Sequence, residues 1–256
     1  MKSALIGYTG FVGTTLSNQT TFDDYYNSKN IAEIQNKHYK MVICAGAPAV
    51  KWKANQDPVQ DLENINSLIS HLKTIQADEF ILISTVDVYK SPNNVDENTI
   101  INPDDLDPYG KHRFFLEQFV REKFDNHFII RLPGLFGRGL KKNFIYDMIH
   151  DNCLHLTHHK SIFQFYDMSR LWSDITFVKK QGFKVINFST EPVSASEIVE
   201  NCFNKNFNNV TDKAPVNYNM KSIYSEHFNL GELYMTSKKE TYFRIREFIR
   251  METTSK

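Results

Sequence analysis

Short runs of consecutive apolar residues alternate along the chain with longer stretches in which apolar residues recur every three or four positions. Runs such as MVICA and FILIS predict strands buried on both faces, which is typical of a parallel sheet. The predicted strands are Ala4–Gly7, Met41–Ala45, Phe80–Ser84, Phe128–Leu132 and Lys184–Phe188. The predicted helices are Phe11–Asn18, Asp57–Gln76, Gly110–Lys123, Asn143–Asp151 and Ala195–Asn204.

This alternation predicts an α/β protein with a Rossmann-type, doubly wound parallel sheet. The rhythm of strand and helix weakens after residue 134. We therefore expect one domain over residues 1–134 and a smaller C-terminal substrate lobe over residues 135–256. Within that lobe, residues 184–189 are expected to return to the main sheet.

Composition narrows the classes of protein that the chain can belong to. Hydrophobic residues make up 41% of the 256 residues, enough for a packed core rather than a disordered chain. The 30 basic and 30 acidic side chains balance, which disfavours a nucleic-acid partner. No apolar run reaches the length of a membrane span, so we expect no membrane partner.

Cysteine usage and the first residues bear on the compartment. Cys44, Cys153 and Cys202 lie far apart with no CxxC pair, which fits a reducing compartment and provides no metal framework. The apolar run Ala4–Ile6 is too short for a secretion signal. The sequence thus predicts a cytoplasmic protein without a metal site.

A glycine-rich turn follows the first predicted strand and opens the first predicted helix. Its sequence is Gly7-Tyr8-Thr9-Gly10-Phe11-Val12-Gly13, with the spacing GxxGxxG. The first glycine permits a tight turn, the second a close approach of the backbone to a pyrophosphate, and the third close packing of helix on strand. The phosphates would lie at the helix N-terminus, where free N–H groups favour anions. The turn therefore predicts a dinucleotide cofactor; a purely structural turn is the alternative.

The end of the second strand bears on which dinucleotide binds. An acidic residue about 20 positions beyond the motif would accept from a ribose 2′-hydroxyl. Asp23 and Asp24 come slightly early, whereas the expected strand end carries Asn27, Ser28 and Lys29. Donors and a cation suit a 2′-phosphate, so these residues favour NADP over NAD without excluding NAD.

Two further segments carry candidate chemistry. The strand at Phe80 ends in Ser84 and Thr85, and polar residues at the carboxyl end of a central strand face the ligand crevice of such folds. Tyr109 and Arg113 are four residues apart at the start of a predicted helix and share one face of it. The histidine pair His158-His159 lacks a third ligand at metal spacing.

Taken together, the segments GYTGFVG, MVICAGAP, DLENINSL, ISTVDVY, PYGKHR, RLPGLFG and VINFSTEPVSASEI resemble the extended short-chain dehydrogenase/reductase superfamily, the branch of NAD-dependent epimerases and dehydratases. They cover most of the chain in the expected order. The short stretch between Lys29 and Met41 leaves no room for an extra strand and helix. In that respect the N-terminal half resembles the dTDP-4-dehydrorhamnose reductase type more than the longer epimerases.

The resemblance implies roles for particular residues. Tyr109 matches the catalytic tyrosine, which exchanges a proton with the substrate oxygen, and Thr85 matches the serine or threonine that hydrogen-bonds the same oxygen. A tyrosine has an ordinary pKa near 10, and a neighbouring cation would lower it. The family lysine is replaced by Arg113, which keeps its charge but does not deprotonate. We expect an altered or slower enzyme, with a non-catalytic remnant as the alternative.

Asp87 matches an acid that acts as a base in the dehydratases of the superfamily. The adjacent acid of the dTDP-glucose type is Val86 here. One carboxylate suits a single proton transfer, as in epimerisation. The alternative, which we weight equally, is that Asp87 caps a loop or pairs with a lysine.

The resemblance also assigns binding residues. Beyond residues 7–13, 27–29, Tyr109 and Arg113, the cofactor would contact Ala45, Gly46, Ala47, Asn64, Ser84, Leu132, Pro133, Gly134 and Leu135. The substrate would contact Asp87, Arg138, Lys141, Lys142, Asn143 and Tyr166. The cations would suit a diphosphate, although a solvated helix start explains them almost as well, and aromatic side chains are more often core.

These expectations combine into one leading hypothesis and two others. The leading one is an NAD(P)-dependent epimerase or ketoreductase acting on a nucleotide-activated sugar, with Tyr109 as acid/base. The second is a non-catalytic NADP(H) sensor, and the third is a reductase of a small non-sugar carbonyl. A homodimer through the helix after Tyr109 would be common in the superfamily.

Overall fold

The computed structural model describes residues 2–228 and 233–254. Their chain contacts form two compact units that interleave along the sequence. The first unit runs up to residue 90 and adds residues 100–131 and 170–186. The second contains residues 91–99 and 132–169 and continues from residue 187 onward. The sequence predicts a single boundary at residue 134. In the structure, residues 91–99 already belong to the second unit, and residues 170–186 belong again to the first.

The first unit is built on a parallel sheet. Among the described residues its six strands are ordered β10-β6-β4-β3-β1-β2. Their bounds are β1 (Ser3–Ile6), β2 (Asp24–Tyr26), β3 (His38–Cys44), β4 (Gln76–Thr85), β6 (His127–Leu132) and β10 (Val185–Asn187). Strand order reverses between β1 and β3, the point at which doubly wound sheets bind ligands. The predicted fold class is confirmed.

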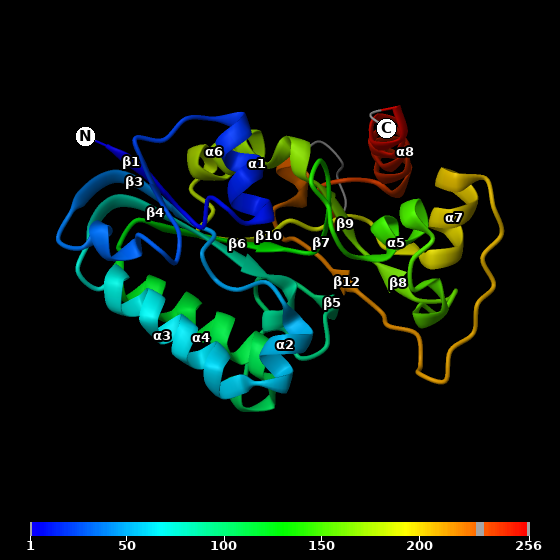
Figure 1. The fold of residues 1–256 in the computed structure, drawn as a ribbon, viewed down its shortest axis with the longest axis horizontal. Coiled ribbons are helices and arrows are strands. Elements are labelled where there is room, and N and C mark those ends of the chain that lie inside the picture. The colour runs from blue at the N-terminus through cyan, green and yellow to red at the C-terminus, as the bar shows by residue number, and fades with distance from the viewer. Residues whose placement is uncertain (1, 229–232, 255–256) are drawn as a thin grey trace. The chain divides into compact units, whose positions relative to one another are not determined.

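Helices cover both faces of this sheet. Figure 1 shows α1 (Phe11–Gln19) and α6 (Leu171–Gln181) on one face, with α3 (Pro58–Leu72) and α4 (Pro108–Lys123) on the other. The short helix α2 (Lys51–Gln56) packs against α3 and α4. The prediction that α3 extends to residue 76 is wrong, because Gln76 already begins β4.

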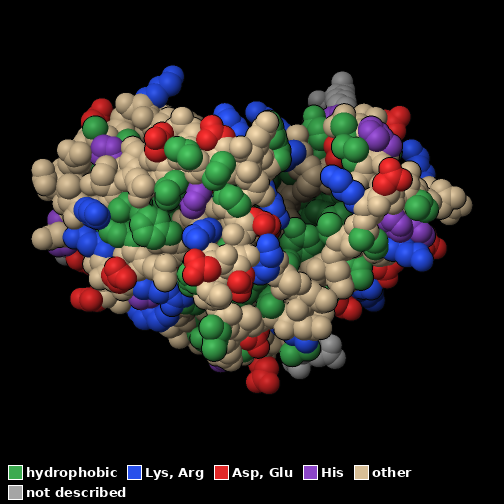
Figure 2. Space-filling model, turned by 90° about the horizontal axis from the view of Figure 1, so that it is seen from below, with side chains coloured by type: hydrophobic (Ala, Val, Ile, Leu, Met, Phe, Trp, Pro, Cys, Tyr) green, Lys and Arg blue, Asp and Glu red, His purple; other side chains and the backbone are tan. Residues whose placement is uncertain are grey.

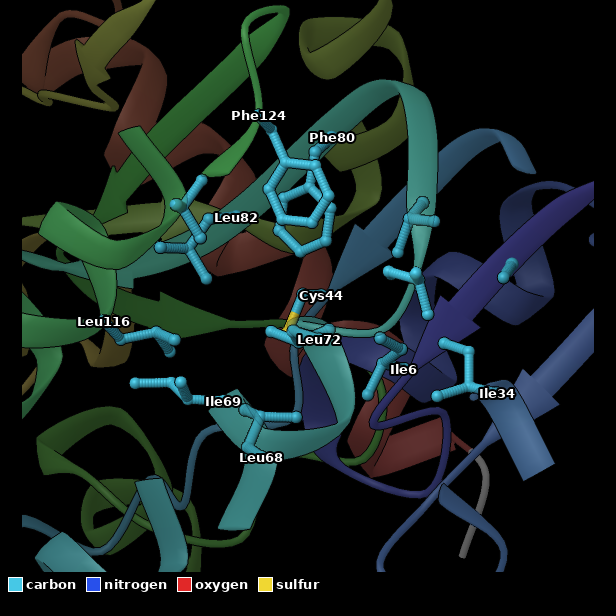
Figure 3. Packing of buried hydrophobic residues seen from close by; sticks show 14 of the residues in the cluster. Ile6, Ile34, Cys44, Leu68, Ile69, Leu72, Phe80, Leu82, Leu116 and Phe124 are labelled. Atoms are coloured by element: carbon cyan, nitrogen blue, oxygen red, sulfur yellow. The ribbon is translucent and has the colours of Figure 1, made fainter. Parts of the chain in front are cut away.

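The core of the first unit lies between the sheet and the α3–α4 layer. Residues of β3 and β4 such as Cys44, Phe80 and Leu82 are buried there against Leu72 and Leu116, as Figure 3 shows. The rings of Phe80 and Phe124 stack with centroids 4.1 Å apart. Strands covered on both faces need continuous apolar runs, which explains sequences such as MVIC.

In its described residues, the second unit contains short strand pairs and three helices. Its strands are β5 (Asn93–Val95), β7 (Gly134–Phe136), β8 (Ile162–Phe163), β9 (Phe165–Asp167), β11 (Val193–Ser194) and β12 (Asn219–Met220). They pair as β7 with β9, β8 with β11, and β5 with β12. Helices α5 (Phe144–His150), α7 (Ala195–Phe203) and α8 (Lys238–Thr254) share a second apolar core that includes Ile145, Ile198 and Ile245. The 3₁₀ turns of both units are Ile31–Ile34, Val86–Val88, Pro103–Asp105, Leu154–Leu156, Met168–Arg170 and Ser225–Phe228.

Hydrogen bonds to the half-buried Glu97 hold the 91–99 segment within the second unit. Glu97 accepts hydrogen bonds from the Asn187 and Ile223 backbone N–H groups at 2.8 and 2.9 Å and from the Ser222 hydroxyl at 2.7 Å. Burial raises the pKa of Glu97 above its ordinary value, because these three donors do not fully offset the lost hydration.

Positively and negatively charged side chains are mixed on the surface. On the face drawn in Figure 2, Lys and Arg side chains alternate with Asp and Glu rather than forming one field, in keeping with the balanced composition. Among residues 2–228 and 233–254, no helix combines the length and apolarity needed to cross a membrane.

Candidate active site

The glycine turn lies where β1 meets α1, and two of its glycines are demanded by close backbone contacts. Gly7 has φ +85°, and a Cβ there would overlap the Ala45 carbonyl at the end of β3. A Cβ at Gly13 would overlap the Gly7 carbonyl. Any larger residue at either position would push apart strand, turn and helix.

Gly10 differs from Gly7 and Gly13 because the fold leaves room for a Cβ atom at this position. It caps α1 without a side-chain hydrogen bond, and a Cβ there would meet only the Gly7 oxygen, at 3.4 Å. The first-turn N–H groups of α1 therefore have no side-chain cap, and the backbone in front of them carries no side chain. This cradle fits the pyrophosphate of a dinucleotide.

The end of the second strand lies beside this turn. β2 runs parallel to β1, and the Gly7 N–H donates to the Tyr26 carbonyl at 2.7 Å. Residues 27–29 follow directly, with Ser28 and Lys29 exposed and the Asn27 side chain accepting from the Lys29 N–H at 2.8 Å. The acidic candidates lie at the opposite end of the strand.

Asp23 and Asp24 are engaged in bonds that hold the start of the sheet. Asp23 accepts from the Ser3 N–H at 2.7 Å, which lowers the pKa of its carboxyl. Asp24 accepts from the Tyr39 hydroxyl at 2.8 Å and pairs with Lys2 at 3.2 Å. Neither carboxylate lies at the carboxyl end of β2, where a ribose would be gripped.

The other cofactor candidates of the first unit are divided between the sheet edge and the α3 surface. The Ala45 N–H donates to the Ile6 carbonyl at 2.9 Å, so residues 45–47 continue from β3 directly beside the glycine turn. Asn64 lies exposed on α3. Leu132 ends β6 and begins the second unit.

Tyr109 and Thr85 meet at the carboxyl end of β4. Thr85 is the last residue of that strand, and Tyr109 is the second residue of α4. The Thr85 side chain lies close enough to the Tyr109 hydroxyl to act on its ionisation, in the direction that lowers the pKa of the tyrosine. The Tyr109 N–H donates to the Asn55 side chain at 2.9 Å, and a Cβ at Gly110 would overlap the Asp87 carbonyl, so the start of α4 is packed tightly against this loop.

Arg113 is clamped beneath the tyrosine by a carboxylate of α3. Its two terminal nitrogens bind the Asp61 carboxylate, one at 2.9 Å, and one of them also donates to the Pro48 carbonyl. The guanidinium carbon lies 4.1 Å from the centre of the Tyr109 ring. Arg113 is 3% exposed and Asp61 is 5% exposed. The His112 Nδ1–H donates to the same carboxylate at 2.7 Å.

Sequence reasoning missed Asp61 and His112, although one signal was present. Asp61 lies on the buried stripe of α3, in line with Ile65, Leu68 and Leu72. A carboxylate in an apolar stripe needs a buried cation or donors. Burial opposes its ionisation, yet the hydrogen bonds from Arg113 and His112 prevail and hold the pKa of Asp61 below its ordinary value.

The electrostatic environment of Tyr109 differs from the expectation that a neighbouring cation lowers its pKa. Tyr109 is 7% exposed, and this burial raises the pKa of its hydroxyl. Arg113, the Thr85 hydroxyl and Lys51 act in the lowering direction, while the Asp87 charge acts in the raising direction. The result lies above the ordinary value, so the hydroxyl is held in its protonated form.

Asp87 pairs with a lysine, one of the two alternatives that the sequence left open. Lys51 Nζ of α2 lies 2.6 Å from Asp87 Oδ1. The Asp87 N–H donates to Thr85 Oγ1 at 3.2 Å, and the Thr85 hydroxyl donates to Asp87 Oδ2 at 3.4 Å. Asp87 is thus placed one hydrogen bond from the hydroxyl pair.

Ser84 points away from this group. Its hydroxyl donates to Glu117 at 2.6 Å, and Glu117 is bound by Arg131 through Nε and Nη2 at 3.0 and 2.6 Å. Arg131 Nη1 donates to the Tyr89 hydroxyl at 2.7 Å. The alternation of side chains along a strand explains this placement, because Ser84 and Thr85 face opposite sides of the sheet. Ser84 thereby serves the core rather than the cofactor side.

The candidates in the second unit divide between surface and core. Arg138, Lys141 and Lys142 are exposed, although partial desolvation of the Lys142 ammonium lowers its pKa. Asn143 caps α5 by accepting from the Tyr146 N–H at 3.1 Å.

Tyr166 is 1% exposed and packs on Phe188 with ring centroids 5.1 Å apart. Its ring is part of the core, the more frequent fate of aromatic side chains, and so is covered from any ligand. The remaining candidates, Pro133, Gly134 and Leu135, lead into β7, where Gly134 pairs with Phe165 of β9. In the described part of the chain no group of three His, Cys, Asp or Glu side chains could hold a metal ion.

No protein-family model matches the chain, and no curated protein matches it in sequence. Solved structures do match, over nearly the whole chain. The dTDP-4-dehydrorhamnose reductase of Bacillus anthracis in complex with NADP has a TM-score of 0.73 at 19% identity, covering 98% of both chains. MoeE5 in complex with UDP-glucuronic acid and NAD has a TM-score of 0.73 at 16% identity, covering 98% of this chain and 100% of that one.

A third structure extends the comparison to an epimerase. The UDP-N-acetylglucosamine 4-epimerase of Methanobrevibacter ruminantium has a TM-score of 0.72 at 13% identity, covering 100% of this chain and 99% of that one. At such identities the likeness establishes the fold. This chain therefore has the fold of dTDP-4-dehydrorhamnose reductases and UDP-sugar epimerases, as its resemblance to the extended short-chain dehydrogenases/reductases predicts.

Proposed function

We propose that this protein is an NAD(P)-dependent reductase or epimerase that acts on a nucleotide-activated sugar. The observation that carries the proposal is the placement of the Tyr109 and Thr85 side chains together at the carboxyl end of β4. Strand β4 belongs to the same parallel sheet as β1, which leads into the glycine turn. Proteins of this fold bind NADP, NAD and UDP-sugars in their solved structures.

The residues of the glycine turn fit a dinucleotide. Gly10 leaves the start of α1 without side chains, so that the backbone N–H groups there would bind the pyrophosphate. Asn27, Ser28 and Lys29 follow β2 directly and supply donors and one cation near the adenosine ribose, which favours NADP over NAD. The cofactor, when bound, would supply or accept the hydride.

The residues of this chain would handle the proton. Tyr109, held protonated by burial, would donate to the substrate oxygen during reduction and take a proton back from it during oxidation. Thr85 would hold that oxygen and the tyrosine in line through its own hydroxyl. Arg113, fixed under the ring, would stabilise the phenolate that forms.

The first experiment titrates purified protein with NADPH and NADH, followed by fluorescence or calorimetry. We expect binding of at least one, with NADPH tighter, and weaker discrimination in Lys29→Ala. Turnover is then tested with NADPH and dTDP-4-dehydrorhamnose, and epimerisation with UDP-glucose and UDP-N-acetylglucosamine. Tyr109→Phe should bind the cofactor unchanged and lose about 100-fold or more in turnover.

One observation favours a second candidate, an NADP(H)-binding protein without turnover. The Asp61 carboxylate occupies both terminal nitrogens of Arg113, and the pKa of Tyr109 lies above its ordinary value. A sensor would bind NADPH and show no turnover with any sugar nucleotide, and Arg113→Lys would leave this unchanged. Folded protein that binds neither dinucleotide would contradict both candidates.

A further inference from the structure

A tyrosine that donates a proton at each turnover must recover it from solvent, and the burial of Tyr109 makes this recovery a structural problem. Only 7% of the residue is exposed. The cation under its ring, Arg113, keeps its proton at any pH that a protein tolerates. Asp61 and the Pro48 carbonyl also hold its terminal nitrogens in place. Arg113 can therefore supply charge to Tyr109 but no proton.

A second set of side chains leads from the same hydroxyl toward the surface. Thr85 lies beside the Tyr109 hydroxyl and donates to Asp87 Oδ2 at 3.4 Å. Asp87 Oδ1 lies 2.6 Å from Lys51 Nζ. The side chains become steadily more accessible along this path, from 17% for Asp87 to 45% for Lys51. An ammonium group at the outer end can exchange protons with water.

We propose that Lys51, acting through Asp87 and Thr85, is the positioning residue that returns the proton to Tyr109 after each turnover. The structure thus divides two tasks between two cations: Arg113 provides a permanent charge, and Lys51 provides an exchangeable proton. This inference rests on the proposed function, because it concerns the proton that Tyr109 gives to the substrate oxygen.

The transfer balances without any further reactant. Donation from Tyr109 to the substrate oxygen leaves a phenolate. The Asp87 carboxylate then takes a proton from the Lys51 ammonium and passes it to the Thr85 oxygen as the Thr85 hydroxyl proton moves to the phenolate oxygen. One O–H bond forms at Tyr109 and one N–H bond breaks at Lys51, with Thr85 and Asp87 unchanged. The Lys51 amine regains its proton from water.

The test compares three variants of one helix. Lys51→Ala should bind NADPH as the wild type does but lose about 100-fold in steady-state turnover, the scale of a proton-transfer contribution. Lys51→Arg keeps the ion pair with Asp87 but releases no proton, so it should lose turnover to a similar extent. Lys53→Ala, an exposed lysine of the same helix, should be unchanged.

Chemical rescue separates proton supply from structure. Added methylamine should restore turnover in Lys51→Ala, with a dependence on amine concentration and pH, and should leave Lys51→Arg and the wild type unaffected. Full activity in Lys51→Arg, or no rescue of Lys51→Ala by amine, would overturn the inference and reduce Lys51 to an anchor for Asp87. A wild type that binds neither NADPH nor NADH would instead contradict the proposed function.

A readout without substrate tests the same coupling. The ultraviolet absorbance of phenolate, taken as the difference from a Tyr109→Phe background, follows the ionisation of Tyr109 in the free protein. The charges and donors that face its hydroxyl are Arg113, Asp87, Lys51 and Thr85. Lys51→Ala should raise the pKa of Tyr109, Asp87→Asn should lower it, and Lys53→Ala should leave it alone. Any other order would overturn the inference.

Discussion

Two buried arginines of the first unit each bind a carboxylate, yet their surroundings differ. Arg131 uses Nε, Nη1 and Nη2 on Glu117 and Tyr89, so that all its nitrogens have partners. Arg113 uses its two terminal nitrogens, and within the described residues its Nε is buried without a hydrogen-bond partner. Every nitrogen of Arg131 therefore has a hydrogen-bond partner, whereas the Nε–H group of Arg113 is, in the described part of the chain, a buried donor without one.

The comparison shows how one helix serves both a core and a site. Glu117 lies one turn beyond Arg113 on α4, where Ser84 and Arg131 surround it from β4 and β6. Satisfied buried networks rigidify the fold, while an unsatisfied buried donor demands an explanation such as a bound ligand. We therefore interpret Arg131–Glu117 as structural and Arg113–Asp61 as part of the candidate site.

The largest expected effect on stability follows removal of Arg131, whose nitrogens all have hydrogen-bond partners. Arg131→Met leaves Glu117 buried without its partner and should lower the free energy of unfolding by about 3–5 kcal/mol in urea denaturation. The double variant Arg131→Met with Glu117→Leu removes both charges and should recover most of that loss. Equal instability of the single and double variants would show that the charge left behind is not the cause.

Weakening the Arg113–Asp61 pair should lower the free energy of unfolding by a smaller amount. Asp61→Asn retains an oxygen that can accept from Arg113, so we expect a loss of about 2 kcal/mol in urea unfolding at neutral pH. Asp61→Ala should lose more, because it removes the acceptor as well. A loss in Asp61→Asn as large as that of Arg131→Met would remove the distinction between the two pairs.

The pH dependence of stability should separate Asp61 from Glu97 of the second unit. The pKa of Asp61 lies below its ordinary 3.8, so its stabilising contribution is present above that pH and is lost as pH falls through the folded pKa. The pKa of Glu97 lies above its ordinary 4.5, so protonation of Glu97 favours the folded state as pH falls toward 4.5.

Unfolding midpoints of the wild type, Asp61→Asn and Glu97→Gln across the acidic range measure both signs. Asp61→Asn should flatten the loss of stability on the acid side, and Glu97→Gln should remove the gain near 4.5. Parallel profiles in all three proteins would contradict the assigned directions.

A smaller effect is expected at Ser84, whose role the sequence and the structure interpret differently. Ser84→Ala removes one hydrogen bond to the Glu117 carboxylate and should cost about 1.5 kcal/mol of stability. NADPH affinity should stay the same, since the hydroxyl serves the core. Weakened NADPH binding with unchanged stability would restore Ser84 to the cofactor site.

The smallest effect is expected for an exposed cation of the same helix. Lys111 lies two residues before Arg113 and pairs with Asp104 at 3.2 Å on the surface. Lys111→Ala should change the free energy of unfolding by less than about 0.5 kcal/mol, because exposed ion pairs contribute little. A larger change would mean that charge on α4 matters irrespective of burial, which would weaken the comparison of the two buried arginines.

Local patterns in the sequence were sufficient for strands β1, β3, β4, β6 and β10, for helices α1, α3 and α4, and for the glycine turn. Each depends on neighbours a few residues apart, such as the apolar run of β3 or the spacing of Gly7, Gly10 and Gly13. They were insufficient for α2 and α6 of the first unit and for α8, which no predicted helix covers. The buried positions of α8, Tyr242, Ile245 and Phe248, do follow helical spacing among its many charges.

The sequence by itself determined the fold class and the candidate hydroxyls, Thr85 and Tyr109. Tertiary structure decided which partners surround them. Asp61 reaches Arg113 across 52 residues, Ser84 reaches Glu117 across 33, and Lys51 reaches Asp87 across 36. Such pairings depend on how helices pack on the sheet rather than on local spacing, because only the folded chain brings distant charges out of water together.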